Sequence, residues 1–237
     1  MTSTTCLRDS VLDFFVETDQ SGEGISFRPC NLVIAGWAGR DRDSVQAHIR
    51  ELEALGVRPP RKTPLFYKVA SSLLTTAPTI QVVGETSSGE VEAVILRSEG
   101  QLWVGVGSDH TDRKLEAVGV TISKQVCAKP IGTMLWRLEE VEPHWDRLEL
   151  RSYVHAGGAR RLYQQGSVST LHAPSDLIAR FRQEGGVFES GAVMFCGTVP
   201  VHGEFQYADQ LEVELCDPVL KRTLNHRYLV DMLPIQD

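Results

Sequence analysis

The stretch Glu90-Val-Glu-Ala-Val-Ile-Leu96 places two carboxylates at the start of a run of apolar, partly β-branched residues. This run predicts a buried strand. Residues 102–106, which follow the next turn signal and are also mostly apolar, predict a second one. Short runs of the same kind recur along the chain, at 31–37, 65–69, 80–83, 148–154, 193–196, 211–215 and 227–230. Apolar residues at helical spacing predict amphipathic helices over 43–55 and 176–183. The sequence therefore predicts a mostly β protein of the α+β class, with two or three helices.

The composition is that of a globular protein and excludes several classes. The 237 residues carry 31 acidic and 24 basic side chains, a formal net charge of −7, without a stripe of clustered Lys and Arg. We therefore expect no nucleic-acid partner. No apolar run approaches the roughly 20 residues that span a bilayer, and the first residues do not resemble a signal peptide, so we expect no membrane partner. Five cysteines without a C-x-x-C pair favour a reduced, cytoplasmic protein over a disulfide scaffold or a zinc site.

The first predicted helix carries a His and a Glu one turn apart. Asp43 and Gln46 resemble a capping box at its start. His48 and Glu51 fall at the edge of the apolar stripe, where the helix would meet either the core or a cleft. Alternatively, the two side chains form a helix-surface pair of modest stabilising effect.

The carboxylates of Glu90 and Glu92 are expected to share one face of their strand, because residues two apart in a strand point the same way. Two neighbouring carboxylates on a partly buried face repel each other and are costly to desolvate. A divalent cation would relieve both costs, and all-oxygen ligation suits Mg²⁺, Mn²⁺ or Ca²⁺ better than zinc. The competing interpretation is the solvent-facing half of an amphipathic strand.

A second acidic cluster, Asp109-His-Thr-Asp-Arg113, follows the next strand directly. Asp109 could be a third ligand, with Arg113 placed to pair with it or with an anionic substrate. His110 is expected to point away from such a site. A turn whose Asp and Thr residues bond to its own backbone explains the cluster equally well.

Taken in order, these segments resemble the fumarylacetoacetate hydrolase superfamily, which includes acylpyruvases and oxaloacetate decarboxylases. The resemblance is carried by the E-x-E strand, the D-x-T-x-R-like segment, a lysine, and a G-T-x-P-like turn, here 90–92, 109–113, Lys124 and 197–200. Upstream, 39–41 and 48–51 resemble the G-R-N…H-x-x-E helix of the acylpyruvase-like members. The resemblance covers roughly residues 30–230. The sequence is similar to a bacterial branch of the superfamily, and its substrate does not follow from the family name.

The resemblance implies a rolled mixed β-sheet, barrel-like and commonly dimeric, with 1–60 as an N-terminal strand and lid-helix region and 61–237 as the catalytic domain. It implies Glu90, Glu92 and Asp109 as ligands of a divalent metal, Mg²⁺ first. The implied catalytic residues are His48 and Glu51, which deprotonate water, and Lys124, which stabilises an enolate or carboxylate. The implied substrate-binding residues are Arg113, Gly197, Thr198 and Gln165.

The implied activity is metal-dependent hydrolysis of a C–C bond next to a carbonyl in a small oxo acid or diketone, such as an acylpyruvate, by a cytoplasmic homodimer. Two alternatives stay open: a metal-dependent decarboxylase or isomerase of a 2-oxo acid, and a non-catalytic metabolite-binding protein. The chain departs from the family pattern in the short spacing of 17 residues from Glu92 to Asp109. It also departs after Lys124, where Gln-Val-Cys replaces Ser-Phe-Asp, and at 201–203.

Overall fold

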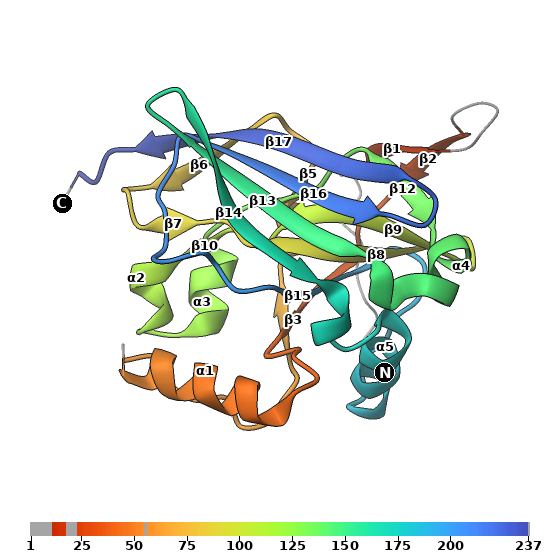
Figure 1. Ribbon diagram of the computed structural model, residues 1–237, viewed down its shortest axis with the longest axis horizontal. Coiled ribbons are helices and arrows are strands. Elements are labelled where there is room, and N and C mark those ends of the chain that lie inside the picture. The colour runs from red at the N-terminus through yellow and green to blue at the C-terminus, as the bar shows by residue number, and fades with distance from the viewer. Residues whose placement is uncertain (1–10, 18–22, 55, 237) are drawn as a thin grey trace.

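Two β-sheets and a few helices make up the fold of the computed structural model, which describes residues 11–17, 23–54 and 56–236 (Figure 1). The larger sheet has eight strands in the order β2-β1-β12-β9-β8-β15-β3-β4. Their bounds are β1 Leu12–Val16, β2 Glu23–Phe27, β3 Asn31–Gly36, β4 Leu65–Val69, β8 Val91–Ser98, β9 Gln101–Ser108, β12 Met134–Arg137 and β15 Ala192–Thr198. The pairs β1/β12 and β15/β3 are parallel, whereas the other neighbours are antiparallel.

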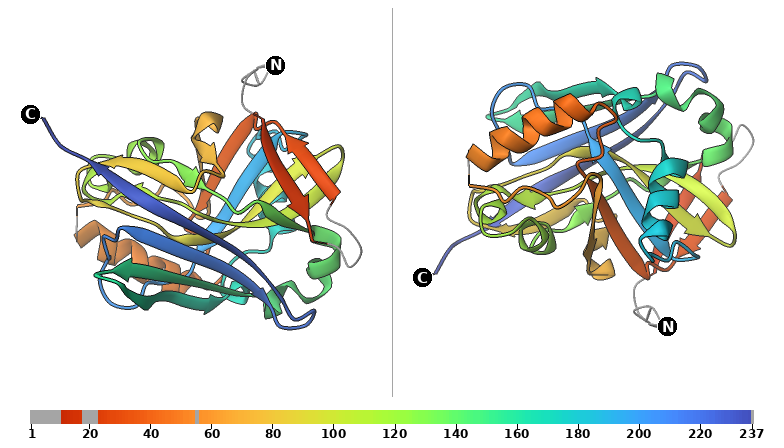
Figure 2. Two further views of the ribbon diagram at one scale, coloured as in Figure 1. Left: turned by 90° about the horizontal axis from the view of Figure 1, so that it is seen from above. Right: turned by 90° about the horizontal axis from the view of Figure 1, so that it is seen from below.

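The second sheet has five strands in the order β14-β13-β16-β17-β6. Their bounds are β6 Thr79–Val83, β13 Glu149–Ala156, β14 Ala159–Ser167, β16 Gln210–Asp217 and β17 Arg222–Leu233. Two short pairs, β7 (Ser87–Ser88) with β10 (Thr111–Asp112) and β5 (Leu74–Thr75) with β11 (Lys129–Pro130), complete the pairing. The larger sheet is curled into a half-barrel, which confirms the predicted rolled, mixed α+β fold (Figure 2).

The α-helices are α1 Arg42–Ala54, α2 Arg113–Glu116, α3 Val120–Gln125, α4 Leu138–Val141 and α5 Pro174–Gln183. In two of the views, α1 and α5 lie on the side of the molecule opposite β17 (Figure 1, Figure 2). Helix α1 begins with Asp41 as its cap, because the Ser44 N–H donates to Asp41 Oδ1 at 2.7 Å. The predicted helix is confirmed, but its cap lies two residues before the predicted Asp43. The described part of residues 1–60 also supplies β1, β2 and β3, and the division at residue 60 stays a prediction.

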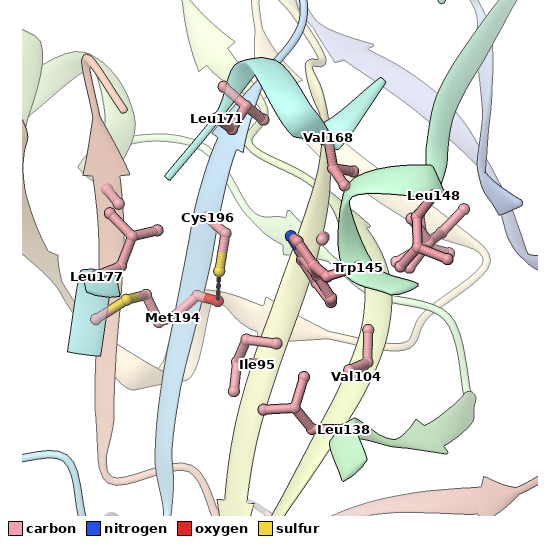
Figure 3. Close-up of a cluster of buried hydrophobic side chains, with 14 of the residues drawn as sticks. Ile95, Val104, Leu138, Trp145, Leu148, Val168, Leu171, Leu177, Met194 and Cys196 are labelled. Carbon is pink, nitrogen blue, oxygen red and sulfur yellow. Dashed lines mark hydrogen bonds between the residues drawn. The ribbon is translucent and has the colours of Figure 1, made fainter. Parts of the chain in front are cut away.

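Strand β8 is buried on both faces, which explains its nearly continuous apolar run. Val91, Ala93 and Ile95 face one core cluster, whereas Val94 and Leu96 face the other. The first cluster is covered by α5 and by the 3₁₀ helix Glu142–Arg147. Figure 3 shows part of it, with Ile95 and Val104 near Trp145.

Three cysteines, Cys127, Cys196 and Cys216, are free thiols. Cys30 is disulfide-bonded, so the expectation that every cysteine is reduced is wrong for this residue. Among the helices of the described residues, none combines the length and the apolar character needed to cross a membrane.

His226 on β17 predicts a pH-dependent stability. Its ring stacks on Tyr228 with centroids 5.8 Å apart, and its buried Nε2 has no hydrogen-bond partner among the described residues. Burial lowers the pKa of His226 to about 4. Between about pH 4 and about pH 6.5 the unfolded chain therefore binds up to one more proton than the folded chain. The stability that neutral His226 contributes is lost as pH falls through this range. In urea denaturation, H226Q should reduce the slope of unfolding free energy against pH in this window by up to about 1.4 kcal/mol per pH unit. An unchanged slope would contradict the assignment, and the exposed His202, as H202Q, is the control.

Candidate active site

One cavity of about 470 Å³ collects most of the predicted site residues. Its walls come from α1, α2, α3 and the ends of β3 and β15. The predicted residues that line it are His48, Glu90, Glu92, Asp109, Arg113, Lys124, Gly197 and Thr198. Glu51 and Gln165 do not line it. Segments far apart in the sequence thus converge on one site.

Glu92 is the most isolated of the three carboxylates. Glu92 is 2% exposed, and its Oε2 accepts a hydrogen bond of 2.7 Å from the Gly197 N–H. Among the described residues, no Lys, Arg or His lies within ion-pair distance of it. Burial, together with the nearby charge of Asp109, raises the pKa of Glu92 well above its ordinary value. A buried carboxylate of this kind favours a cation or a proton beside it.

Gly197 can approach Glu92 because it has no side chain. Its φ is +93°, and a Cβ atom there would lie 2.7 Å from the Cβ of Ala38. A larger residue would both strain the backbone and push Ala38 away. The glycine therefore serves to present its N–H to Glu92.

Asp109 directly follows β9 and faces two lysines. Its Oδ2 accepts a hydrogen bond from Lys124 of α3, and its Oδ1 lies 3.4 Å from the Nζ of Lys129. Burial alone would raise the pKa of Asp109, but the charges of Lys124 and Lys129 hold it below its ordinary value. Burial likewise opposes the charge of Lys124, yet Asp109 and Glu90 raise its pKa above the ordinary value. Asp109 and Lys124 therefore form a buried ion pair.

Arg113 joins two further carboxylates at the start of α2. Its Nη2 lies 3.3 Å from Glu90 Oε1, and its Nη1 lies 3.3 Å from Glu116 Oε2. Its Nε donates to the Ser88 hydroxyl at 2.7 Å, and the guanidinium lies over the ring of Phe205 at 4.2 Å. The sequence predicted Arg113 but not Glu116, which is one helical turn further on. Arg113 therefore pairs with Glu90 instead of with the predicted Asp109.

Lys129 is a second residue that the sequence interpretation missed. It is 0% exposed, and its Nζ donates to the carbonyls of His110 and Lys124 at 2.6 Å and of Cys127 at 2.9 Å. Burial lowers its pKa despite the opposing charge of Asp109. Its only signal in the sequence is a charged residue directly before Pro130 and Ile131, which a surface turn would show equally. The contacts tie the loop after α3 to the segment that carries Asp109.

His110 points away from the cavity, as predicted. Its Nδ1 lies 3.1 Å from the Tyr228 hydroxyl, and its Nε2 lies 3.0 Å from the Ser87 hydroxyl. Burial lowers the pKa of His110 to about 3, so the ring is neutral. This histidine supports the site from behind without contacting its contents.

Thr198 reaches the cavity and bonds to Gln164, whereas Gln165, which was predicted to bind substrate, does not line the cavity. The Thr198 hydroxyl donates to the Val91 carbonyl at 2.8 Å and accepts from Gln164 Nε2 at 2.8 Å. The Gln164 Oε1 accepts from the Val91 N–H at 3.0 Å and from the Ser152 hydroxyl at 2.9 Å. Gln165 is exposed on the other face of β14. Gln164 therefore fixes the strand ends on which Glu92 and Thr198 stand.

His48 and Glu51 lie on α1 as predicted, with His48 Nδ1 3.5 Å from Glu51 Oε2. Both side chains are well exposed, at 58% and 75%. The His48 ring lies beside Trp37, with centroids 5.6 Å apart. Only the His48 side chain lines the cavity, and Glu51 stands behind it on the helix surface.

The donor set suits a hard divalent cation. Four carboxylates and three cationic side chains meet at this end of the cavity or directly behind it, namely Glu90, Glu92, Asp109, Glu116, Arg113, Lys124 and Lys129. Their formal charges sum to one negative charge, which a divalent ion would convert to one positive charge. The available oxygens are those of carboxylates. Within the part of the chain that the structure describes, Glu92 has no basic partner and Asp109 Oδ1 has no hydrogen bond. Within the described ranges, however, no three His, Cys, Asp or Glu side chains form a metal-holding group. The residues fit a divalent ion by type and charge. In the structure, however, Asp109 is paired with Lys124 and Glu90 with Arg113.

The curled sheet is the fold of fumarylacetoacetate hydrolase-type proteins. A crystal structure from Oleispira antarctica, described as a candidate fumarylacetoacetate isomerase/hydrolase, matches with a TM-score of 0.66 and 19% identity, over 92% of this chain and 99% of that one. A candidate fumarylpyruvate hydrolase from Burkholderia cenocepacia matches with a TM-score of 0.62 and 18% identity, over 97% and 100%. A 2-keto-3-deoxy-D-arabinonate dehydratase complexed with magnesium and 2,5-dioxopentanoate matches with a TM-score of 0.60 and 16% identity, over 91% and 79%.

By sequence, the chain belongs to the family described as "Protein of unknown function (DUF2848)", whose model matches residues 35–228. No curated protein sequence matches the chain. The predicted resemblance to the fumarylacetoacetate hydrolase superfamily is thus confirmed in the fold.

Proposed function

We propose that this protein is a divalent-metal-dependent enzyme that hydrolyses the C–C bond next to a carbonyl in a small oxo acid. The observation that carries the proposal is the single cavity, which brings together three carboxylates, two buried cationic side chains and His48. The names of the structural relatives, which include candidate hydrolases of this type and a magnesium complex of a dehydratase, support it. A cytoplasmic homodimer stays a prediction.

Glu90, Glu92 and Asp109 are the residues that would hold the metal, and Mg²⁺ suits their oxygens best, with Mn²⁺ or Ca²⁺ as alternatives. A bound divalent ion would supply Lewis-acid polarisation of the substrate carbonyl. The Gly197 N–H keeps one Glu92 oxygen in a fixed direction, which leaves the other available. Lys124 and Arg113, whose partners in the structure are Asp109 and Glu90, would face the anionic end of the substrate when those carboxylates hold a metal.

His48 would take the proton from a water molecule. Glu51 lies on its Nδ1 side, which leaves Nε2 as the basic nitrogen. The water oxygen forms a bond to the carbonyl carbon remote from the carboxylate, and the C–C bond then breaks. Its electron pair passes to an enolate, which Lys124 stabilises by charge and which the proton returned from His48 converts to a 2-oxo acid. The second product is a carboxylic acid.

A decarboxylase or isomerase on the same scaffold is the second candidate, and the uneven burial of the site favours it. Lys124 and Asp109 are buried, at 8% and 1% side-chain exposure, whereas His48 and Glu51 stand exposed. The Lys124–Asp109 pair, which would stabilise an enolate, is therefore more deeply buried than the His48–Glu51 pair, which would activate water. Decarboxylation needs the metal and the stabilised enolate but no attacking water.

The test is turnover of acylpyruvates and oxaloacetate with Mg²⁺ or Mn²⁺, by the wild type and by H48N and E51Q. H202N and E53Q are the controls, since both residues are exposed and lie outside the cavity. We expect H48N to slow acylpyruvate hydrolysis by about 100-fold or more and E51Q to a smaller extent. Hydrolysis that survives in H48N would remove the water-activating role, and decarboxylation without hydrolysis would select the second candidate. Absence of turnover and of metal binding in the wild type would leave the non-catalytic alternative.

A further inference from the structure

We infer that the substrate is a monoacid whose tail is uncharged and apolar, and that the cavity discriminates against a second carboxylate at the far end of the substrate. This inference rests on the proposed function, since it names the substrate class of the same site. It divides the oxo acids that such a site could accept into two groups, monoacids with an acyl tail and dicarboxylates.

Most charged groups of the cavity belong to one set of elements, the exceptions being Arg40 and Asp41 directly before α1. Glu90, Glu92 and Asp109 stand at the ends of β8 and β9, and Arg113 and Lys124 come from α2 and α3. These cations form ion pairs with the carboxylates next to them. The oxo acid end of the substrate therefore belongs here, where cations and the metal ligands lie together.

The rest of the wall is mainly aromatic and aliphatic. Its larger apolar members include Trp37, Val45, Leu52, Val57, Tyr67, Val120 and Phe205, of which Phe205 lies against Arg113. The Trp37 indole donates to the Tyr67 hydroxyl at 3.1 Å, so the polar atom of the indole has a partner within the wall. Apolar walls of this kind bind substrates by burying apolar surface.

Helix α1 connects this apolar wall with the proposed reaction. Val45, His48 and Leu52 recur at helical spacing and all line the cavity, so they occupy one face of the helix. The carbonyl that water would attack must lie near His48, and the substituent on that carbonyl is the acyl tail. The tail consequently lies along Val45 and Leu52.

Basic side chains are sparse on the side of the cavity that α1 forms. Arg40 is the one basic side chain among the described cavity residues outside α2 and α3, apart from His48. Its guanidinium already pairs with both oxygens of Asp146, at 2.8 and 2.6 Å. The neighbouring Asp41 adds a negative charge to the same wall. A dicarboxylate would therefore bring an uncompensated charge against apolar and acidic groups.

The experiment compares butyrylpyruvate with succinylpyruvate, two substrates of matched length that differ in a terminal methyl or carboxylate. We expect kcat/KM for butyrylpyruvate to be at least about 10-fold higher. In the series from acetylpyruvate to hexanoylpyruvate, kcat/KM should rise by up to about fourfold per added methylene, until the cavity is full. A preference for succinylpyruvate, or a flat series, would overturn the inference while the proposed function stands.

The variant L52R places a cation on the apolar wall and should lower the butyryl-to-succinyl ratio of kcat/KM by at least about 10-fold. The milder L52Q should lower the ratio less and covers the case in which L52R does not fold. L162R is the matched control, because Leu162 is an exposed leucine on β14 outside the cavity. An unchanged ratio in both Leu52 variants would also overturn the inference.

A third readout separates this inference from the proposed function. If none of the acylpyruvates is turned over with Mg²⁺ or Mn²⁺, the proposed function fails, and the same compounds are then compared as ligands by thermal unfolding. A larger increase in Tm with hexanoylpyruvate than with succinylpyruvate would still support the apolar site. An equal or smaller increase would refute it.

Discussion

Replacing Glu92 by Gln is expected to slow turnover by about 100- to 1000-fold without lowering the stability of the fold. Glu92 is 2% exposed, has one hydrogen bond to the backbone, and has a raised pKa because of its burial. A neutral amide can still accept from the Gly197 N–H, and it removes the cost of a buried charge. The same change, however, removes a metal ligand. The expected combination is an inactive protein whose unfolding free energy at pH 8 equals or exceeds that of the wild type.

The measurement is steady-state turnover together with urea denaturation at pH 8, with E85Q as control because Glu85 is exposed and lies outside the cavity. A structural role for Glu92 would give the opposite combination. In that case E92Q would lose stability and retain turnover per folded molecule, and the assignment of Glu92 to the metal site would have to be abandoned.

Replacing Lys129 by Met is expected to lower the unfolding free energy by about 3–5 kcal/mol, the usual cost of breaking a buried ion pair from one side. The ammonium is fully buried and bonds to three carbonyls, and Asp109 Oδ1 lies 3.4 Å away. Met occupies a similar volume but leaves those acceptors without a donor. For a chain of 237 residues, this loss corresponds to a decrease in Tm of about 10 °C.

Urea denaturation of K129M tests this expectation, with the exposed Lys114, as K114M, for comparison. The double variant D109N/K129M provides a second test, because Asp109 is a charged partner of Lys129. We expect K129M to cost less in the D109N background than in the wild type. Equal costs in the two backgrounds would show that Lys129 acts through the carbonyls alone, and a cost below about 1 kcal/mol would contradict the buried pair altogether.

The part of the site carried by local spacing was predictable from the sequence. Glu90 and Glu92 line the same cavity as predicted, because the alternation of a strand fixes which residues share a face. His48 and Glu51 likewise lie one turn apart on a helix. In both cases, residues close in sequence determine the geometry.

Features that depend on long-range packing were not predictable. The pairing register of β13 and β14 shifts between Ser152 and Tyr153, and the consecutive residues Tyr163 and Gln164 on β14 are both buried. This bulge breaks the alternation of the strand, and the resemblance, which implied Gln165, gave no sign that the neighbouring Gln164 is the buried residue. Glu116 was missed because the short helix α2, which places it one turn from Arg113, was not predicted, and Lys129 was missed because only tertiary packing brings His110 and Asp109 to it.

The most direct test of the proposed metal enzyme is the turnover of butyrylpyruvate by metal-stripped protein before and after Mn²⁺ is added, with the bound ion counted by calorimetry. We expect no turnover without the ion, full recovery at one Mn²⁺ per chain, and loss of both binding and recovery in E92Q. Turnover that continues undiminished in the presence of a chelator would contradict the assignment of Glu90, Glu92 and Asp109 as ligands of a required metal ion.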